Sequence, residues 1–264
     1  MKTSRWPSLN HKIVLVTGAS SGIGRACAWA FATAGAKLIL AARRGDRLAG
    51  LAASLTRAYG TAVHLWPLDV RDRAAVESGL RRLPAAWRRI EILLNNAGLS
   101  RGLERLHEGS VQDWEEMIDT NVKGLLYMSR AVIPGMVARR RGTIVNIGSI
   151  AGHETYPGGA VYCASKRAVD ALTTGLRMDL VDTPLRVCTV DPGMVETEFS
   201  LVRFHGDRAR AKKVYEGLKP LTAADVADAV LYCVTRPPHV QVAEIVLLHT
   251  AQAGATMVHR SAQP

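Results

Sequence analysis

The segment 12–24, KIVLVTGASSGIG, joins a short apolar and β-branched run to a glycine-rich turn. Residues 25–33 then follow the pattern of a helix, so the segment predicts a strand, a glycine loop and a helix in direct succession. Glycines at this spacing allow a tight turn and close approach of a ligand, while the N–H groups of the helix N-terminus are free to bind a pyrophosphate. We expect a dinucleotide to contact the loop at Gly18, Ser20, Ser21, Gly22, Ile23 and Gly24.

Strands and helices alternate along the rest of the chain. Apolar runs predict further strands at 37–41, 61–68, 90–94, 141–148, 185–190 and 244–248, and helical patterns fill the intervals at 46–59, 72–89, 111–139, 159–180 and 222–235. This alternation predicts one α/β domain over residues 1–264, a doubly wound Rossmann fold whose seven-stranded, mostly parallel sheet carries helices on both faces. Its outlying segments are a polar N-terminal tail at 1–10, a lid-like insertion at about 195–217 and a polar C-terminal tail at 250–264.

Two arginines follow the second predicted strand. Arg43 and Arg44 stand about twenty residues past the glycines, where a unit that binds NAD usually has an acid for the ribose 2'-hydroxyl. A pair of guanidinium groups suits a 2'-phosphate instead, so we expect NADP(H) as the cofactor. The alternative is that both residues only begin the helix at 46–59, but an arginine in the first turn opposes the helix dipole.

Polar or glycine-containing segments end three more predicted strands. The carboxyl ends of parallel strands meet at one edge of a sheet, and ligands bind at that edge. The alternative for each segment is a plain turn, but the same edge is marked repeatedly. The cofactor contacts expected from these segments are Asp69, Val70, Asn96, Ala97, Gly98, Pro192 and Gly193.

The segment 149–166 carries a hydroxyl, a phenol and an ammonium. Tyr162 and Lys166 stand four residues apart, so on a helix their side chains are neighbours. An ammonium at ~4 Å, with an effective dielectric constant of about 20, would lower the pKa of the phenol by roughly three units. Ser149 ends a predicted strand, and its hydroxyl could hold a substrate oxygen. The alternative is a core tyrosine, a surface lysine and a loop serine.

The net charge of +11 favours anionic partners. The arginines are scattered without interleaved aromatic residues, so we expect small anionic molecules and no nucleic acid. No apolar run has the length of a membrane span and the N-terminus lacks the apolar core of a signal peptide, so we expect no membrane partner and a cytoplasmic protein. The four cysteines form no C-x-x-C pair and none stands beside a histidine at metal-ligand spacing, so we expect no metal site.

Several motifs together resemble the short-chain dehydrogenase/reductase family. They are TGASSGIG at 17–24, NNAG at 95–98, Asn121, Ser149, Tyr162-x-x-x-Lys166 and Asp191-Pro192-Gly193. The resemblance implies that Tyr162 is the catalytic acid-base and that Ser149 holds the substrate oxygen. Lys166 would bind the nicotinamide ribose and lower the pKa of the tyrosine.

The same resemblance gives roles to three further residues. Asn121, which is mildly unfavourable inside a helix, would support a proton-relay water beside Lys166. Val195 and Thr197 would contact the nicotinamide end of the cofactor.

The second half of the chain is similar to a narrower group. VETEFSLVRFHGD at 195–207 and PLTAADVADAV at 220–230 resemble NADP-dependent dehydrogenases of 3-hydroxy acids, which include serine and allo-threonine dehydrogenases. This resemblance implies oxidation of a 3-hydroxy acid by NADP+, or the reverse reduction, in a homotetramer. The chain departs from the group at Ser100–Arg101 and at 248–250. As substrate contacts we expect Arg203 on the carboxylate, with His153 and Tyr156 as pocket walls.

Two other functions are compatible with the sequence. One is a reductase of other ketones, aldehydes or 3-oxoacyl groups. The other is a nucleotide-sensing binding protein built on the same sheet, which would not need the serine, tyrosine and lysine that this chain has.

Overall fold

The computed structural model describes residues 8–261. Its centre is a seven-stranded sheet in which every pairing is parallel, in the order β3-β2-β1-β4-β5-β6-β9. The strand order reverses between β1 and β4, which is the point where ligands bind in sheets of this kind. The strands are β1 (Ile13–Thr17), β2 (Lys37–Ala42), β3 (Val63–Pro67), β4 (Ile90–Asn95), β5 (Thr143–Ile147), β6 (Arg186–Pro192) and β9 (Glu244–Leu247). The predicted fold is confirmed.

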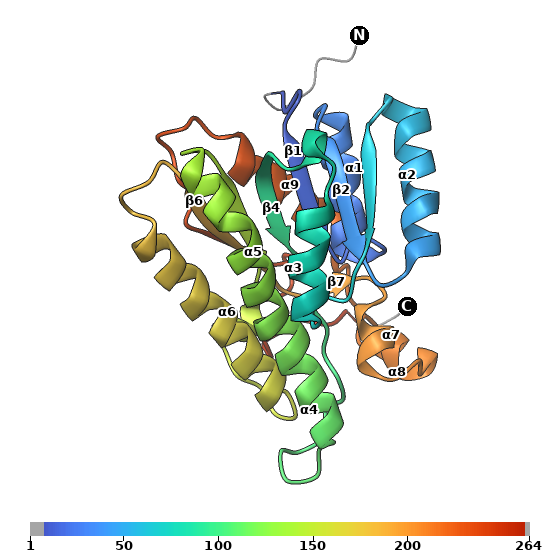
Figure 1. The fold of residues 1–264 in the computed structure, drawn as a ribbon. Helices are drawn as coiled ribbons and strands as arrows, with labels where there is room; N and C mark the ends of the chain where they lie inside the picture. The colour runs from blue at the N-terminus through green and yellow to red at the C-terminus, as the bar shows by residue number, and fades with distance from the viewer. Residues whose placement is uncertain (1–7, 262–264) are drawn as a thin grey trace.

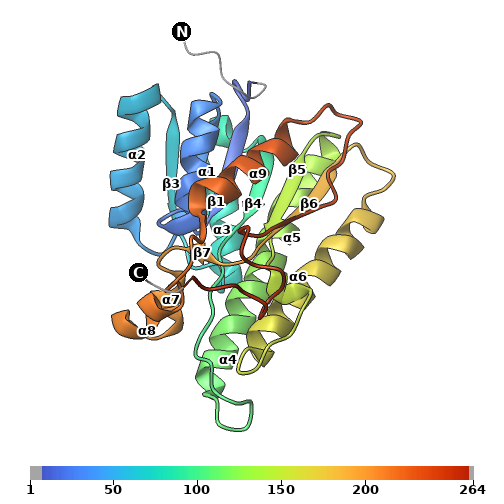
Figure 2. The same ribbon diagram turned by 180° about the vertical axis from the view of Figure 1, so that it is seen from behind.

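Helices cover both faces of the sheet (Figures 1 and 2). Alternate residues of β1 enter two separate cores, because successive side chains of a strand point to opposite faces. Val14 and Val16 pack in one core with α1 and α9, and Ile13 and Leu15 pack in the other with α3 and α5. One layer contains α1 (Gly22–Thr33), α2 (Gly45–Tyr59) and α9 (Ala223–Thr235), and the other contains α3 (Arg73–Arg82), α5 (Leu125–Ala138) and α6 (Ala160–Asp179).

One predicted helix is shorter than expected, and another helical stretch is interrupted. The helix expected at 72–89 ends at Arg82, because the residue before Pro84 is held in an extended conformation, and only a short 3₁₀ turn follows at Ala85–Trp87. The stretch 111–139 is divided into α4 (Val111–Ile118), a π-helical turn at Asp119–Gly124 and α5. A π-helical turn inside a longer helix is frequent at functional sites.

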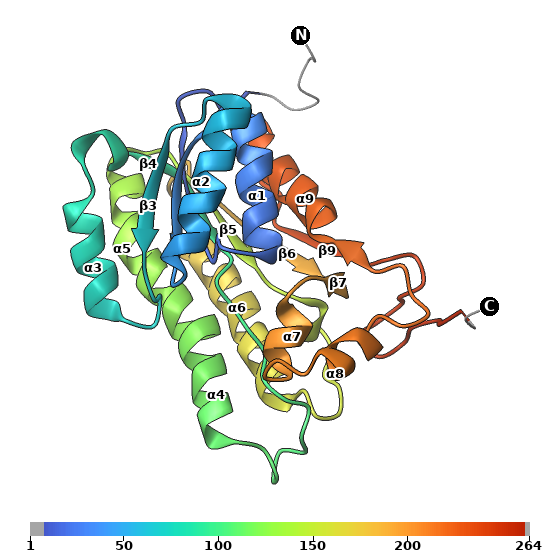
Figure 3. The ribbon, with the colours of Figure 1, turned by 90° about the vertical axis from the view of Figure 1, so that its right-hand side faces the viewer.

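The expected lid-like insertion consists of short elements beyond the carboxyl ends of the strands (Figure 3). Its two helices follow β7, which pairs with β8 in a separate two-stranded sheet. The elements are β7 (Val195–Glu196), α7 (Phe199–Arg203), α8 (Arg208–Lys213) and β8 (Leu221–Thr222).

The described parts of both tails pack on the domain. Leu9 is buried, and its N–H donates to the carbonyl of Ala34. Gln252 is buried as well, and its side-chain oxygen accepts from the N–H of Met194 beside the insertion. Residues 1–7 and 262–264 of the predicted tails lie outside the described residues. Within 8–261 no helix is long and apolar enough to cross a membrane.

Candidate active site

A cavity of about 300 Å³ opens at the carboxyl edge of the sheet, between the glycine loop and α7. It brings together residues from eight separate segments of the chain. The predicted residues that line it are Gly18, Ser20, Ser21, Gly22, Ile23, Arg43, Arg44, Asp69, Val70, Asn96, Ala97, Gly98, Ser149, Tyr162, Lys166, Pro192, Gly193, Val195 and Thr197. The predicted residues outside this lining are Gly24, Asn121, His153, Tyr156 and Arg203.

Two glycines in the loop before α1 and at the start of α1, Gly18 and Gly24, have no room for a side chain. Gly18 has a φ of +65°, and a Cβ there would lie 2.7 Å from the side-chain nitrogen (Nδ2) of Asn96. A Cβ on Gly24, which does not line the cavity, would lie 2.5 Å from the carbonyl oxygen of Gly18, so only glycine allows α1 to pack this closely on the loop. Asn96 fixes the loop by donating to the carbonyl of Thr17 at 2.9 Å. The backbone is therefore open to a flat, phosphate-bearing ligand, so the residues present fit a dinucleotide.

The two arginines after β2 have different surroundings. Arg44 donates to the hydroxyls of Ser20 at 3.0 Å and Ser21 at 2.7 Å, on the glycine loop. The guanidinium of Arg43 is 55% exposed and lies 3.7 Å from the carboxylate of Glu116. Only Arg44 is therefore tied to the loop that would hold phosphates.

Tyr162 and Ser149 meet at the inner end of the cavity. Tyr162 is buried, and its ring centroid lies 5.6 Å from that of Phe199 on α7. Burial raises the pKa of Tyr162, and the neighbouring Tyr156 phenol acts in the same direction, while Arg203 and a hydrogen bond with Ser149 oppose it. The cation that favours the phenolate is therefore Arg203, whose guanidinium carbon is 5.3 Å from the ring centroid.

Lys166 occupies the helix face expected for it, one turn after Tyr162. Its ammonium donates to the carbonyl of Ile147 at 2.9 Å and lies 5.9 Å from the centroid of the Tyr162 ring. Burial lowers the pKa of Lys166 to about 8, and the carboxylate of Asp191 opposes that shift. The bond to the Ile147 carbonyl fixes the ammonium beside the Tyr162 ring.

Asn121 lies in the π-helical turn and connects three segments. Its side-chain oxygen accepts from the N–H of Leu99 at 2.8 Å, and its nitrogen donates to the carbonyl of Leu99 at 2.8 Å and to the hydroxyl of Ser165 at 3.0 Å. Ser165 donates in turn to the carbonyl of Tyr162 at 2.7 Å. Asn121 therefore fixes the position of α6, which carries Tyr162 and Lys166.

The three expected substrate residues separate into two places. Arg203 donates to the hydroxyl of Ser100 at 3.1 Å and to the phenol oxygen of Tyr156 at 3.0 Å, next to the Tyr162 ring. His153 does not line the cavity, and its Nε2 lies 3.2 Å from Asp191 and 3.0 Å from Glu244. These contacts do not support the expected role of His153 as a wall of the pocket.

His153, Asp191 and Glu244 are a group that sequence spacing did not reveal. Their ligand atoms all lie within 4.8 Å of one another, a separation at which such groups can hold a metal ion. The three residues come from the loop after β5, from β6 and from β9, so only the fold brings them together. The cysteine spacing considered in the sequence argument carries no signal for such a set.

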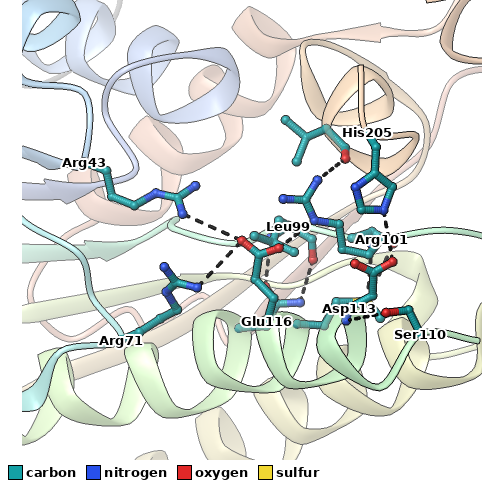
Figure 4. Close-up of polar contacts among 12 residues, drawn as sticks. Arg43, Arg71, Leu99, Arg101, Ser110, Asp113, Glu116 and His205 are labelled. Atoms are coloured by element: carbon teal, nitrogen blue, oxygen red, sulfur yellow. Dashed lines mark hydrogen bonds and ion pairs between the residues drawn. The ribbon is translucent and has the colours of Figure 1, made fainter. Parts of the chain in front are cut away.

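A second unpredicted group surrounds Glu116 on α4 (Figure 4). Its carboxylate accepts from Arg101 at 2.7 Å and lies within 4 Å of the guanidinium groups of Arg43 and Arg71. Arg101 also donates to the carbonyl of Val202 on α7. Arg101, where the sequence departs from the resembling group, thus connects α4 with the insertion.

Comparison with known proteins agrees with this geometry. A model of short chain dehydrogenases matches residues 12–206. The chain is 49% identical over 251 residues to the NADP-dependent 3-hydroxy acid dehydrogenase YdfG of Salmonella typhi, covering 94% of this chain and 100% of the relative. It is 48% identical over 242 residues to sulfoacetaldehyde reductase 2 of Chromohalobacter salexigens, covering 91% and 95%.

A solved structure is similar over almost the same extent. The closed form of serine dehydrogenase complexed with NADP+ has a TM-score of 0.88 and 47% identity, covering 94% of this chain and 100% of that chain. The structural match agrees with the family model and with the sequence identities. The chain belongs to the short chain dehydrogenase family.

Proposed function

We propose that this protein is an NADP(H)-dependent oxidoreductase that interconverts the hydroxyl and the carbonyl of a small 3-hydroxy acid. The observation that carries the proposal is one cavity lined by Ser149, Tyr162 and Lys166 at one end and by the glycine loop with Arg44 at the other. Two similar proteins are described as an NADP-dependent 3-hydroxy acid dehydrogenase and a serine dehydrogenase complexed with NADP+.

Each residue then has a role at a stated atom. When bound, the nicotinamide supplies or accepts the hydride. In oxidation, the phenol oxygen of Tyr162 takes the proton of the substrate hydroxyl, while the Ser149 hydroxyl donates to the same oxygen. The Lys166 ammonium, buried at the inner end of the cavity, binds the nicotinamide ribose, while the Arg203 guanidinium favours the phenolate.

Arg203 is proposed to bind the substrate carboxylate. Its guanidinium packs over the rings of Tyr162 and Phe199, at 5.3 and 5.1 Å from their centroids, so an anion paired with it would lie beside the reacting oxygen. Ser100 and Tyr156 hold the guanidinium in that orientation. The guanidinium N–H groups of an arginine can donate to both oxygens of a carboxylate. They can donate to the oxygens of a sulfonate in the same way.

An absorbance assay tests the proposal. Purified protein is mixed with NADP+ or NAD+ and with serine, allo-threonine, 3-hydroxyisobutyrate or simple secondary alcohols, and with NADPH and sulfoacetaldehyde in the reverse direction. We expect turnover of a hydroxy acid with NADP+, and loss of turnover in Tyr162→Phe. Full activity in Tyr162→Phe contradicts the mechanism, and a preference for NAD+ contradicts the cofactor.

The substrate contact has its own test. Arg203→Ala should raise the KM for an acid substrate roughly tenfold or more, because a charge-assisted pair is lost. The KM for an uncharged secondary alcohol should change little. An unchanged KM for the acid means that another group binds the carboxylate.

We also propose a homotetramer and a cytoplasmic location. The strand β9 forms an edge of the sheet, and its Val246 is 45% exposed, as expected where an edge strand is covered by another subunit. Light scattering of the purified protein measures the assembly, and a monomer at micromolar concentration contradicts it. The location stays a prediction from the sequence.

A further inference from the structure

We propose that Glu198 occupies, in the ligand-free protein, the place that the 2'-phosphate of NADP(H) takes, and that Arg47 is the second arginine of that site. The inference rests on the proposed NADP(H)-dependent function. It concerns which residues set the preference between the phosphorylated and the unphosphorylated cofactor.

The first observation is the set of partners around Arg44. Its Nε and Nη2 donate to the hydroxyl oxygen of Ser20 at 3.1 and 3.0 Å, and Nη2 donates to Ser21 at 2.7 Å. Both serine oxygens accept in these bonds, so each hydroxyl keeps its own proton to donate to an anion. The third nitrogen, Nη1, already donates to a carboxylate oxygen of Glu198 at 3.0 Å. The Glu198 carboxylate is therefore bound by the same guanidinium that binds two hydroxyls of the glycine loop.

The second observation is that Arg47 holds the same carboxylate. Its Nη1 lies 2.8 and 2.9 Å from the two carboxylate oxygens of Glu198. Arg44 is the N-cap of α2 and Arg47 follows one turn later, so both guanidinium groups reach out from the same side of the helix. Glu198 comes from the start of α7, 151 residues farther along the chain than Arg47.

Arg43 does not share this arrangement. Its guanidinium is directed toward Glu116 on α4, as Figure 4 shows. Arg44 and Arg47 are the guanidinium groups that bind the Glu198 carboxylate together. These are the groups that a phosphate would find preorganised.

Displacement of the carboxylate by a phosphate is favourable on simple grounds. A phosphate monoester brings about two negative charges and three oxygens, against one charge and two oxygens for Glu198. The side chains of Arg44, Arg47 and Glu198 are 40%, 45% and 41% exposed, and ion pairs at such exposure are weak. The lost pairs nevertheless reduce the apparent affinity for NADP(H). NAD(H), which has no 2'-phosphate, leaves them in place.

The experiment compares two glutamates that lie two residues apart. Calorimetric titration of the full chain with NADP+ should show that Glu198→Gln lowers the Kd roughly two- to tenfold, the range expected for loss of two exposed pairs. The Kd for NAD+ should stay the same. Glu196→Gln makes the same change in charge at an exposed residue that, within residues 8–261, pairs with neither arginine, and should leave both Kd values unchanged.

Two further variants test the assignment of Arg47. Arg47→Ala should raise the Kd for NADP+ about tenfold and leave that for NAD+ unchanged, because a charge-assisted contact to phosphate is lost. Arg43→Ala should have the smaller effect. A larger effect at Arg43 than at Arg47 overturns the assignment.

The possible outcomes distinguish a failure of this inference from a failure of the proposed NADP(H)-dependent function. Wild-type protein that binds neither dinucleotide overturns the proposed function. Wild-type protein that binds NADP+, together with a Glu198→Gln variant that binds it equally or more weakly, overturns only the role of Glu198. The same result follows if Glu196→Gln tightens binding as much as Glu198→Gln does, since net charge alone would then be responsible.

Discussion

Replacing the buried lysine by an isosteric apolar residue should stabilise the ligand-free protein while removing its activity. Burial lowers the pKa of Lys166 from 10.5 to about 8, so keeping the ammonium charged in the folded state costs roughly 3 kcal/mol at pH 7. Lys166→Met removes that cost but also removes the donor to the Ile147 carbonyl, a loss of about 1 kcal/mol. The net gain of about 2 kcal/mol should raise the melting temperature by roughly 4–8 °C.

The pH dependence of this gain distinguishes its cause. The folded pKa lies below the unfolded one, so between about pH 8 and pH 10.5 the unfolded chain binds more protons and the wild type gains stability as pH rises. The advantage of Lys166→Met should therefore be full below pH 8 and shrink above it. Thermal unfolding followed by circular dichroism, without cofactor, measures both. A variant no more stable than wild type at pH 7, or one whose advantage does not shrink, refutes the reasoning.

A matched control is the same substitution at an exposed lysine. Lys123 is 53% exposed and pairs with Asp119 at 2.8 Å, four residues earlier. Lys123→Met should give no gain in melting temperature and should leave the activity near that of wild type.

Three further changes have expected outcomes. Gly24→Ala should raise the Kd for NADP+, measured by calorimetry, because its Cβ would lie 2.5 Å from a loop carbonyl. Asp191→Asn should move the alkaline limb of the pH profile of kcat/KM to lower pH, since Asp191 raises the pKa of Lys166; an unmoved limb contradicts this. Glu116→Gln should lower the free energy of unfolding in urea by about 1–3 kcal/mol, because it weakens a charge-assisted bond to Arg101.

The sequence predicted what local patterns determine. The apolar runs placed all seven strands of the sheet, and the central ones, such as β1 and β5, are continuous apolar stretches because both of their faces are buried. The glycine loop, Ser149 and the Tyr162–Lys166 spacing were readable because each is local. The end of α3 at Arg82 could also have been read from Pro84.

What the sequence did not predict depends on contacts between distant segments. Glu198 reaches Arg44 across 154 residues and Glu116 reaches Arg101 across 15, and no periodicity marks such pairs. Arg47 is an intermediate case. It stands three residues after Arg44, a helical spacing that could have nominated it as a second cofactor contact. The bond that holds the Lys166 ammonium was also unpredicted, because the Ile147 carbonyl that accepts it belongs to β5.

Part of the positive charge of the chain is concentrated beside the cavity. Glu198 pairs with two arginines, Arg44 and Arg47. Glu116 and Asp69 together pair with three arginines, which are Arg43, Arg71 and Arg101. Each of these two groups of charges therefore has one more positive than negative charge. Such a field attracts an anionic cofactor and substrate, and salt screens it over about 10 Å at 0.1 M. The Kd for NADP+ should therefore rise with added NaCl more steeply than the Kd for NAD+, because the 2'-phosphate adds about two charges near Arg44 and Arg47. Equal salt dependence for both would mean that the phosphate binds away from these clusters.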